Sequence, residues 1–111
     1  MDSFPDTFNR KACIDKMTLN QKELIKETRE TFYKSIMNFT EECNPIMILD
    51  FPDRLWHDHK MTLTKELLDR FGKLKVKIIN TQAEVTKTIT DIKDFPNNVK
   101  RVIIEFSMND D

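Results

Sequence analysis

The chain has 111 residues, 39% of them hydrophobic, and a formal net charge of −1. This length and composition fit one domain with a modest core, and they exclude a wholly disordered chain. Because its net charge is close to zero, the chain lacks the positive electrostatic potential that many nucleic-acid-binding proteins have over their whole surface. Gly72 is the single glycine, which excludes the glycine-rich phosphate loops of nucleotide-binding enzymes.

Three features bear on the compartment. There are only two cysteines, Cys13 and Cys43, fewer than a small secreted domain usually carries. No apolar run reaches the ~18 residues that a membrane span requires. The chain begins MDSFPDTFNRK, which has an acidic start and lacks the apolar core of a signal peptide. We therefore expect an intracellular, cytoplasmic protein in a reducing environment, with no membrane association and no cofactor.

The most regular pattern predicts a long helix over residues 18–43. Thr18 and Gln21 have the spacing of a capping box, which predicts the helix start. The apolar side chains recur at helical spacing on one stripe, which predicts one buried face. The stripe consists of Ile25, Phe32, Ile36, Phe39 and Cys43.

Two strands and a second helix are predicted next. Residues 46–49 are a continuous apolar run between breakers, typical of a strand buried on both faces. The polar stretch 54–61 is expected to be a loop. A helix starting at Thr62 or Thr64 is expected to end at Gly72, which stands where a left-handed residue is required. Residues 74–79 alternate lysine with apolar side chains, which predicts a strand with its lysines on one face.

Residues 82–94 carry two conflicting signals. Four threonines between positions 81 and 90 favour a strand. The capping-box spacing of Thr81 and Glu84, and the helical spacing of Val85, Ile89 and Ile92, favour a helix. We predict a helix, followed by a turn at Asn97 and Asn98 and a last strand at 99–106.

The expected fold class is α/β, with a long N-terminal helix followed by alternating strands and helices. Such alternation implies right-handed crossovers and a small, mainly parallel sheet with helices packed on it. The predicted organisation is a weakly ordered segment at 1–17, a single domain at 18–107 and a frayed tail at 108–111.

The densest polar cluster follows the first predicted strand, where open α/β sheets commonly bind ligands. We interpret this loop, with the helix after it, as a surface that binds another protein, with Trp56 as an aromatic anchor. The candidate contact residues are Asp53, Trp56, His57, Asp58, His59 and Lys60.

The same cluster leaves a metal-dependent hydrolase open as an alternative. His57 and His59 share a face in an extended chain, and carboxylates can complete such a metal site. The alternative ligand set is Asp50, Asp53, His57 and His59. A strand ending in Asp50 is also similar to the nucleophile strand of haloacid-dehalogenase-type phosphatases, but Pro52 stands where that family has its second Asp.

Nucleic-acid binding is a further, less favoured alternative. It uses Lys73, Lys75, Lys77, Lys100 and Arg101. Lysine contacts to phosphates give affinity without sequence preference. No aromatic residue interleaves the three lysines of residues 73–77 as a base-stacking platform would, and lysines on an open strand face commonly protect it from aggregation.

The layout of residues 18–106 resembles the STAS domain, the fold of bacterial anti-sigma factor antagonists. Residues 46–51 are similar to its buried strand, residues 52–61 to its motif loop, and residues 80–85 to the segment that opens its next helix. His59 stands where that family has its phosphorylated Ser or Thr, and Met61 where it has Gly. The resemblance therefore implies the fold and a protein-binding regulatory role without phosphorylation control.

We thus expect a non-catalytic, intracellular, protein-binding regulatory domain. Its partner would be another protein, and a homodimer is also expected because the long helix offers more apolar surface than a thin sheet covers.

Overall fold

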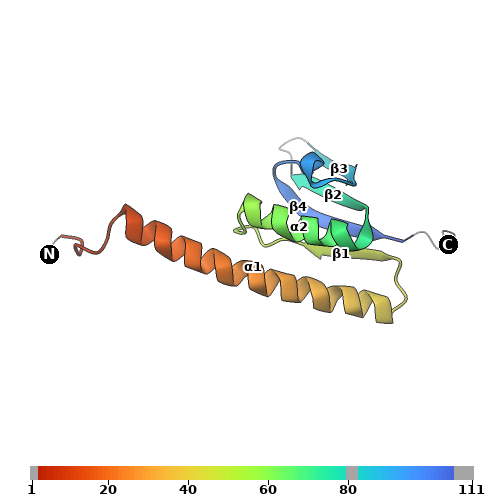
Figure 1. Cartoon of the computed structure of the whole chain (residues 1–111), viewed down its shortest axis with the longest axis horizontal. Helices are drawn as coiled ribbons and strands as arrows, with labels where there is room; N and C mark the ends of the chain where they lie inside the picture. Colours follow the sequence, from red (N-terminus) through yellow and green to blue (C-terminus); the bar gives the residue numbers. More distant parts are fainter. Residues whose placement is uncertain (1–2, 80–82, 107–111) are drawn as a thin grey trace.

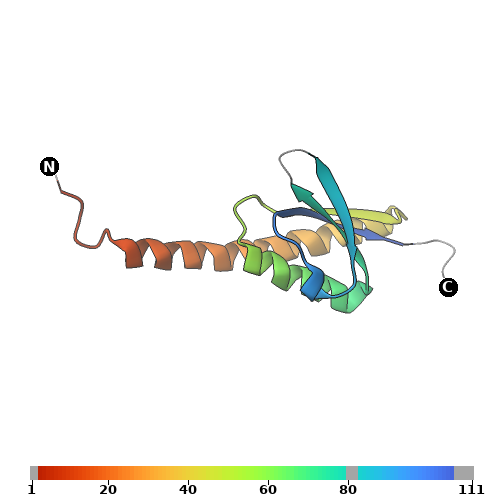
Figure 2. The same ribbon diagram turned by 90° about the horizontal axis from the view of Figure 1, so that it is seen from above.

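The computed structural model describes residues 3–79 and 83–106. Its elements in chain order are α1 (Arg10–Glu41), β1 (Ile46–Asp50), α2 (His57–Phe71), β2 (Leu74–Ile79), β3 (Glu84–Ile89), the 3-10 turn η1 (Ile92–Asp94) and β4 (Val99–Glu105). Both helices lie on one side of a single sheet, and the N-terminal part of α1 extends beyond it (Figures 1 and 2). The predicted tail, 108–111, lies outside the described residues.

The sheet has the order β1-β4-β2-β3, and every neighbouring pair is antiparallel. The predicted mainly parallel sheet is therefore wrong. β1 and β2 do run in the same direction, but β4 lies between them and runs the opposite way. The helix α2 thus joins two parallel strands that are not neighbours.

The error arose at residues 82–94, where the predicted helix is wrong. Residues Glu84–Ile89 form β3, which pairs with β2 as a hairpin, and η1 follows. The hairpin returns the chain beside β2, so β4 then enters antiparallel. Threonine and valine fit a pleated strand better than a helix because branching at Cβ restricts their rotamers. Thr81 of the supposed capping box lies outside the described residues.

The core lies between one face of the sheet and the two helices. Alternate strand residues point into it, including Leu49, Val76 and Val102, which are at most 1% exposed. Leu24 and Phe32 cover them from α1, and α2 contributes three buried leucines, namely Leu63, Leu67 and Leu68. The opposite sheet face is open to solvent, so each strand has one buried and one exposed face.

The helix α1 begins eight residues before the predicted start. The side chain of Asn9 accepts a hydrogen bond from the amide of Ala12 at 2.9 Å and caps the helix. Thr18 does not cap, since its hydroxyl donates to the Ile14 carbonyl within the helix. Cys43, predicted as a core residue, is exposed and lies just beyond the helix end with a φ of 58°.

The helix α2 begins at His57 and therefore includes part of the predicted loop. Its end is confirmed. Gly72 has a φ of 77°, and its amide donates to the Leu68 carbonyl at 2.7 Å. Glycine accepts this left-handed conformation without the steric penalty of a Cβ atom.

The molecule is elongated, with extents of 68 × 32 × 22 Å. Residues 10–17 of α1, which we call the overhang, are exposed all round because the sheet does not reach them (Figure 2). Within the part of the chain that the structure describes, no helix is both long enough and apolar enough to cross a bilayer.

Candidate protein-binding groove

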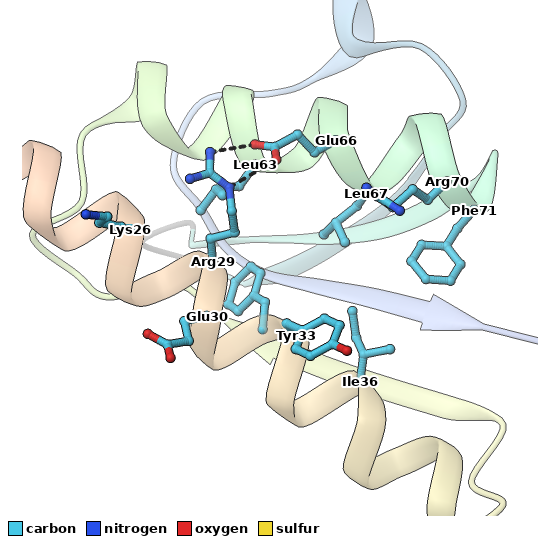
Figure 3. Close-up of a pocket in the computed structure, with 11 residues that line it drawn as sticks. Lys26, Arg29, Glu30, Tyr33, Ile36, Leu63, Glu66, Leu67, Arg70 and Phe71 are labelled. Atoms are coloured by element: carbon cyan, nitrogen blue, oxygen red, sulfur yellow. Dashed lines mark hydrogen bonds and ion pairs between the residues drawn. The ribbon is translucent and has the colours of Figure 1, made fainter.

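A groove with a volume of about 580 Å³ runs between α1 and α2 (Figure 3). Its apolar lining comes from both helices and consists of Phe32, Ile36, Leu63, Leu67 and Phe71. Its polar lining consists of Lys26, Arg29, Glu30, Tyr33, Glu66 and Arg70. An apolar centre with a charged rim is the usual arrangement of a protein-binding surface.

An ion pair between the helices fixes one end of the groove. Arg29 donates from Nε to Glu66 Oε1 at 3.0 Å and from Nη2 to Oε2 at 2.8 Å (Figure 3). This hydrogen bonding raises the pKa of Arg29 above its ordinary value. Both side chains are about half exposed, so the pair contributes little stability, and its forked geometry instead sets the spacing of the helices.

Aromatic side chains dominate the other part of the groove. Tyr33 is 64% exposed, and Figure 3 shows it beside Ile36 with Phe71 across from them on α2. The ring of Phe71 also packs edge-on against Phe106, with ring centres 6.0 Å apart. Exposed tyrosine beside an apolar channel is typical of interface centres.

The apolar surface continues toward the N-terminus. Phe4 and Phe8 stack with ring centres 4.9 Å apart and are 77% and 59% exposed. Further exposed apolar side chains follow on α1, namely Ile14, Met17 and Leu19. Ile14 and Met17 continue the buried stripe of α1 beyond the sheet, whereas Leu19 lies on the side of α1 that carries Tyr33. Two different sides of the N-terminal half of α1 therefore expose apolar side chains.

The predicted contact loop, 53–60, is held against α1. Gln21, which is 7% exposed, donates to the Arg54 carbonyl at 2.8 Å and accepts from the Trp56 amide at 2.9 Å. Trp56 itself remains exposed, with its ring stacked parallel to His59 at a distance of 6.1 Å between centres.

Two of the predicted contact residues are tied into the fold. His57 packs against the ring of Phe95, with centres 5.4 Å apart. Lys60 donates from Nζ to the Val99 carbonyl at 2.9 Å and lies over the ring of Phe51. Burial lowers the pKa of Lys60, and the charge of Asp53 opposes that shift. Asp53 and Asp58 are exposed.

The alternative metal ligands are dispersed. The side chain of Asp50 lies on the solvent-exposed face of the sheet, where both of its carboxylate oxygens accept hydrogen bonds from Arg101 of β4. His57 and His59 make the separate ring contacts given above. Within residues 3–79 and 83–106, no three acidic, histidine or cysteine side chains gather as metal ligands.

Four of the five predicted phosphate-contacting residues do share the open sheet face, but each faces a carboxylate. Lys75 pairs with Glu105 at 2.6 Å, Lys77 and Lys100 both pair with Glu84, and Arg101 pairs with Asp50. Lys73 is exposed in the turn before β2. The face is therefore a mosaic of opposite charges and not a basic patch.

The groove is not apparent from the sequence. Arg29 and Glu66 are 37 positions apart, and no pattern in the sequence pairs them. A usable signal was present on the polar side of α1, where Leu19, Tyr33 and Met37 interrupt the charged residues.

Comparison with known proteins gives no match to a protein-family model, a curated protein or a solved structure.

Proposed function

We propose that the chain is a non-catalytic, protein-binding regulatory domain that acts through the groove between α1 and α2. The observation that carries this proposal is the aromatic, apolar channel with a charged rim, continued by exposed apolar residues along α1. A protein-binding role is also what the resemblance of residues 18–106 to STAS domains implies, although residues 84–89 form a strand where that layout has a helix.

The groove replaces the loop 53–60 as the main contact surface. His57 and Lys60 serve the fold, which leaves Asp53, Trp56, Asp58 and His59 as a secondary contact around the start of α2. We favour protein binding over phosphate binding because the basic side chains of the sheet already face carboxylates. We favour it over metal-dependent hydrolysis because the proposed ligands do not converge.

We also propose a cytoplasmic, reducing location. Cys13 and Cys43 are both free and exposed thiols near opposite ends of a 32-residue helix. They are too far apart to form a disulfide with one another within one chain.

Site-specific crosslinking in the native cell tests the proposal. A photoreactive amino acid at Tyr33, in the groove, should crosslink to a protein chain. The same group at Thr88, on the exposed side of β3, is the matched control and should give little crosslinking. Equal yields at both positions, or no adduct at Tyr33, would overturn the assignment of the groove.

A further inference from the structure

We propose that the partner seated in the groove is a second copy of this chain, in a two-fold dimer whose α1 helices lie antiparallel. Phe8 of each copy would enter the groove of the other, beside Tyr33 and Phe71. This inference rests on the proposed function, because it names the partner of the same groove.

Phe8 cannot fill the groove of its own chain. Asn9 caps α1, and the groove begins at Lys26 on the same helix. At 1.5 Å per residue these positions are separated by roughly 25 Å of continuous helix. The exposed Phe4–Phe8 pair therefore reaches such a groove only on another molecule.

One flank of α1 offers a continuous contact stripe for this arrangement. Its members recur at spacings of three and four, so they share one side of the helix. The groove opens on this flank, because Lys26, Glu30 and Tyr33 belong to both. The full stripe is Lys11, Asp15, Leu19, Lys22, Lys26, Glu30, Tyr33 and Met37, and all of these residues are exposed.

The stripe is complementary to itself when reversed. In one antiparallel register Lys11 lies opposite Glu30 of the second copy. In the same register Asp15 lies opposite Lys26, and Phe8 opposite Tyr33. Two-fold symmetry repeats each pair, as in any isologous interface. Four pairs of opposite charge then lie between the two aromatic contacts, which stand at the ends of the interface, and the groove volume of about 580 Å³ accommodates a phenylalanine ring.

The neighbouring registers bring like charges together. A shift by one helical turn in one direction places Lys11 opposite Lys26 and Asp15 opposite Lys22. Repulsive and attractive pairs are then equal in number, so the net attraction is lost. A shift by about one turn in the other direction places Lys22 opposite its own symmetry copy. Like charges at close range disfavour a wrong register, so the charge pattern selects the register that also brings Phe8 to the groove.

Charge reversal of the full-length chain tests the register. Asp15→Lys alone sets lysine against Lys26 in both symmetric pairs, and Lys26→Asp alone sets aspartate against Asp15. Each variant should dimerise at least about tenfold more weakly than the wild type in sedimentation equilibrium. An equimolar mixture of the two should recover a heterodimer, because every reversed pair is then complementary again. Lys65→Asp, exposed on α2 and outside the groove lining, is the matched control and should leave dimerisation unchanged.

The outcomes separate this inference from the proposed function. A wild-type chain that remains monomeric at high micromolar concentration overturns the dimer, and so does a dimer that is insensitive to both reversals or not restored by mixing. In either case a crosslink from Tyr33 to a different protein would leave the groove as a binding site. Absence of any Tyr33 adduct together with a monomeric chain would overturn both.

Discussion

Gln21 shows how one polar side chain positions the candidate groove. Its amide satisfies the Arg54 carbonyl and the Trp56 amide, both in the connection that leads into α2. The connection is thereby fixed to α1, and the first turn of α2 starts at a defined place beside it. Removal of this buried amide would leave two backbone groups without a hydrogen-bond partner. The free-energy cost of two unpaired buried groups is larger than the net stability that the two hydrogen bonds contribute.

We therefore expect Gln21→Leu to lower the free energy of unfolding by about 2–3 kcal/mol. Urea denaturation at low protein concentration measures this change. Gln21→Glu should be intermediate, since it can still accept from the Trp56 amide but faces the Arg54 carbonyl without a donor. Lys22→Ala, at an exposed neighbouring position, should change stability by less than about 0.5 kcal/mol. A Gln21→Leu protein as stable as Lys22→Ala would show that the connection is held by other contacts.

At the scale of elements, the open sheet face is organised by cross-strand ion pairs. Glu84 at the start of β3 accepts from Lys100 of β4 and from Lys77 of β2, and it thereby connects three strands. These two hydrogen bonds lower the pKa of Glu84 below its ordinary value of 4.5. Lys75 lowers the pKa of Glu105 in the same way.

The sign of the pH dependence follows from these shifts. A carboxyl whose pKa is lower in the folded state stabilises the fold above its unfolded pKa, and this contribution is lost as the pH falls through the folded value. We expect the free energy of unfolding to decrease as the pH drops below about 4.5. Glu84→Gln should make this decrease shallower in denaturation curves collected across the acid range.

The Glu84→Gln comparison contains its own control. The variant and the wild type should differ at pH 7 and converge at low pH, where Glu84 is protonated and resembles glutamine. Both lysines retain their charge throughout the acid range. A stability difference that stayed constant from neutral to acid pH would mean that the ion pairs of Glu84 do not stabilise the sheet.

The elements were predictable from sequence where local signals agreed. The apolar run at 46–49, the lysine alternation at 74–79 and the cap at Gly72 each had one physical interpretation, and the structure confirms the two strands and the helix end. The predicted burial of 46–49 on both faces is wrong, because β1 is an edge strand whose Ile46 and Ile48 lie on the open sheet face. Residues 82–94 carried opposing signals, and pairing with β2 decided in favour of the strand. The parallel sheet followed from that single error, because a helix would have returned the chain to the other end of the sheet.

The candidate groove was less predictable than the elements that build it. Its lining comes from two helices whose contact is set by Arg29 and Glu66, and by Gln21 through the loop. Periodicity identifies the buried stripe of each helix but not how two helices are placed side by side. The loop after β1 stood out in sequence because its residue types are chemically distinctive, although part of it serves packing.

At the scale of the whole molecule, the overhang accounts for an unusual shape. The radius of gyration is 17.6 Å, whereas a compact chain of this length has a value of about 13 Å. A helix that extends beyond its own sheet loses the tertiary packing on which most helices depend for stability. A partner that covers the overhang would supply that packing.

The dimer proposed above makes a specific prediction for small-angle X-ray scattering. Because each overhang lies alongside residues 24–31 of α1 in the other copy, the two chains overlap along much of their length. The scattering mass should therefore double with rising protein concentration while the particle lengthens little. The longest dimension should stay closer to the 68 Å of one chain than to twice that length. The Lys26→Asp variant should keep the monomer mass and a radius of gyration near 17.6 Å over the same concentrations. A dimer almost twice as long as one chain would mean that the copies join end to end, which leaves both grooves empty and contradicts the antiparallel arrangement.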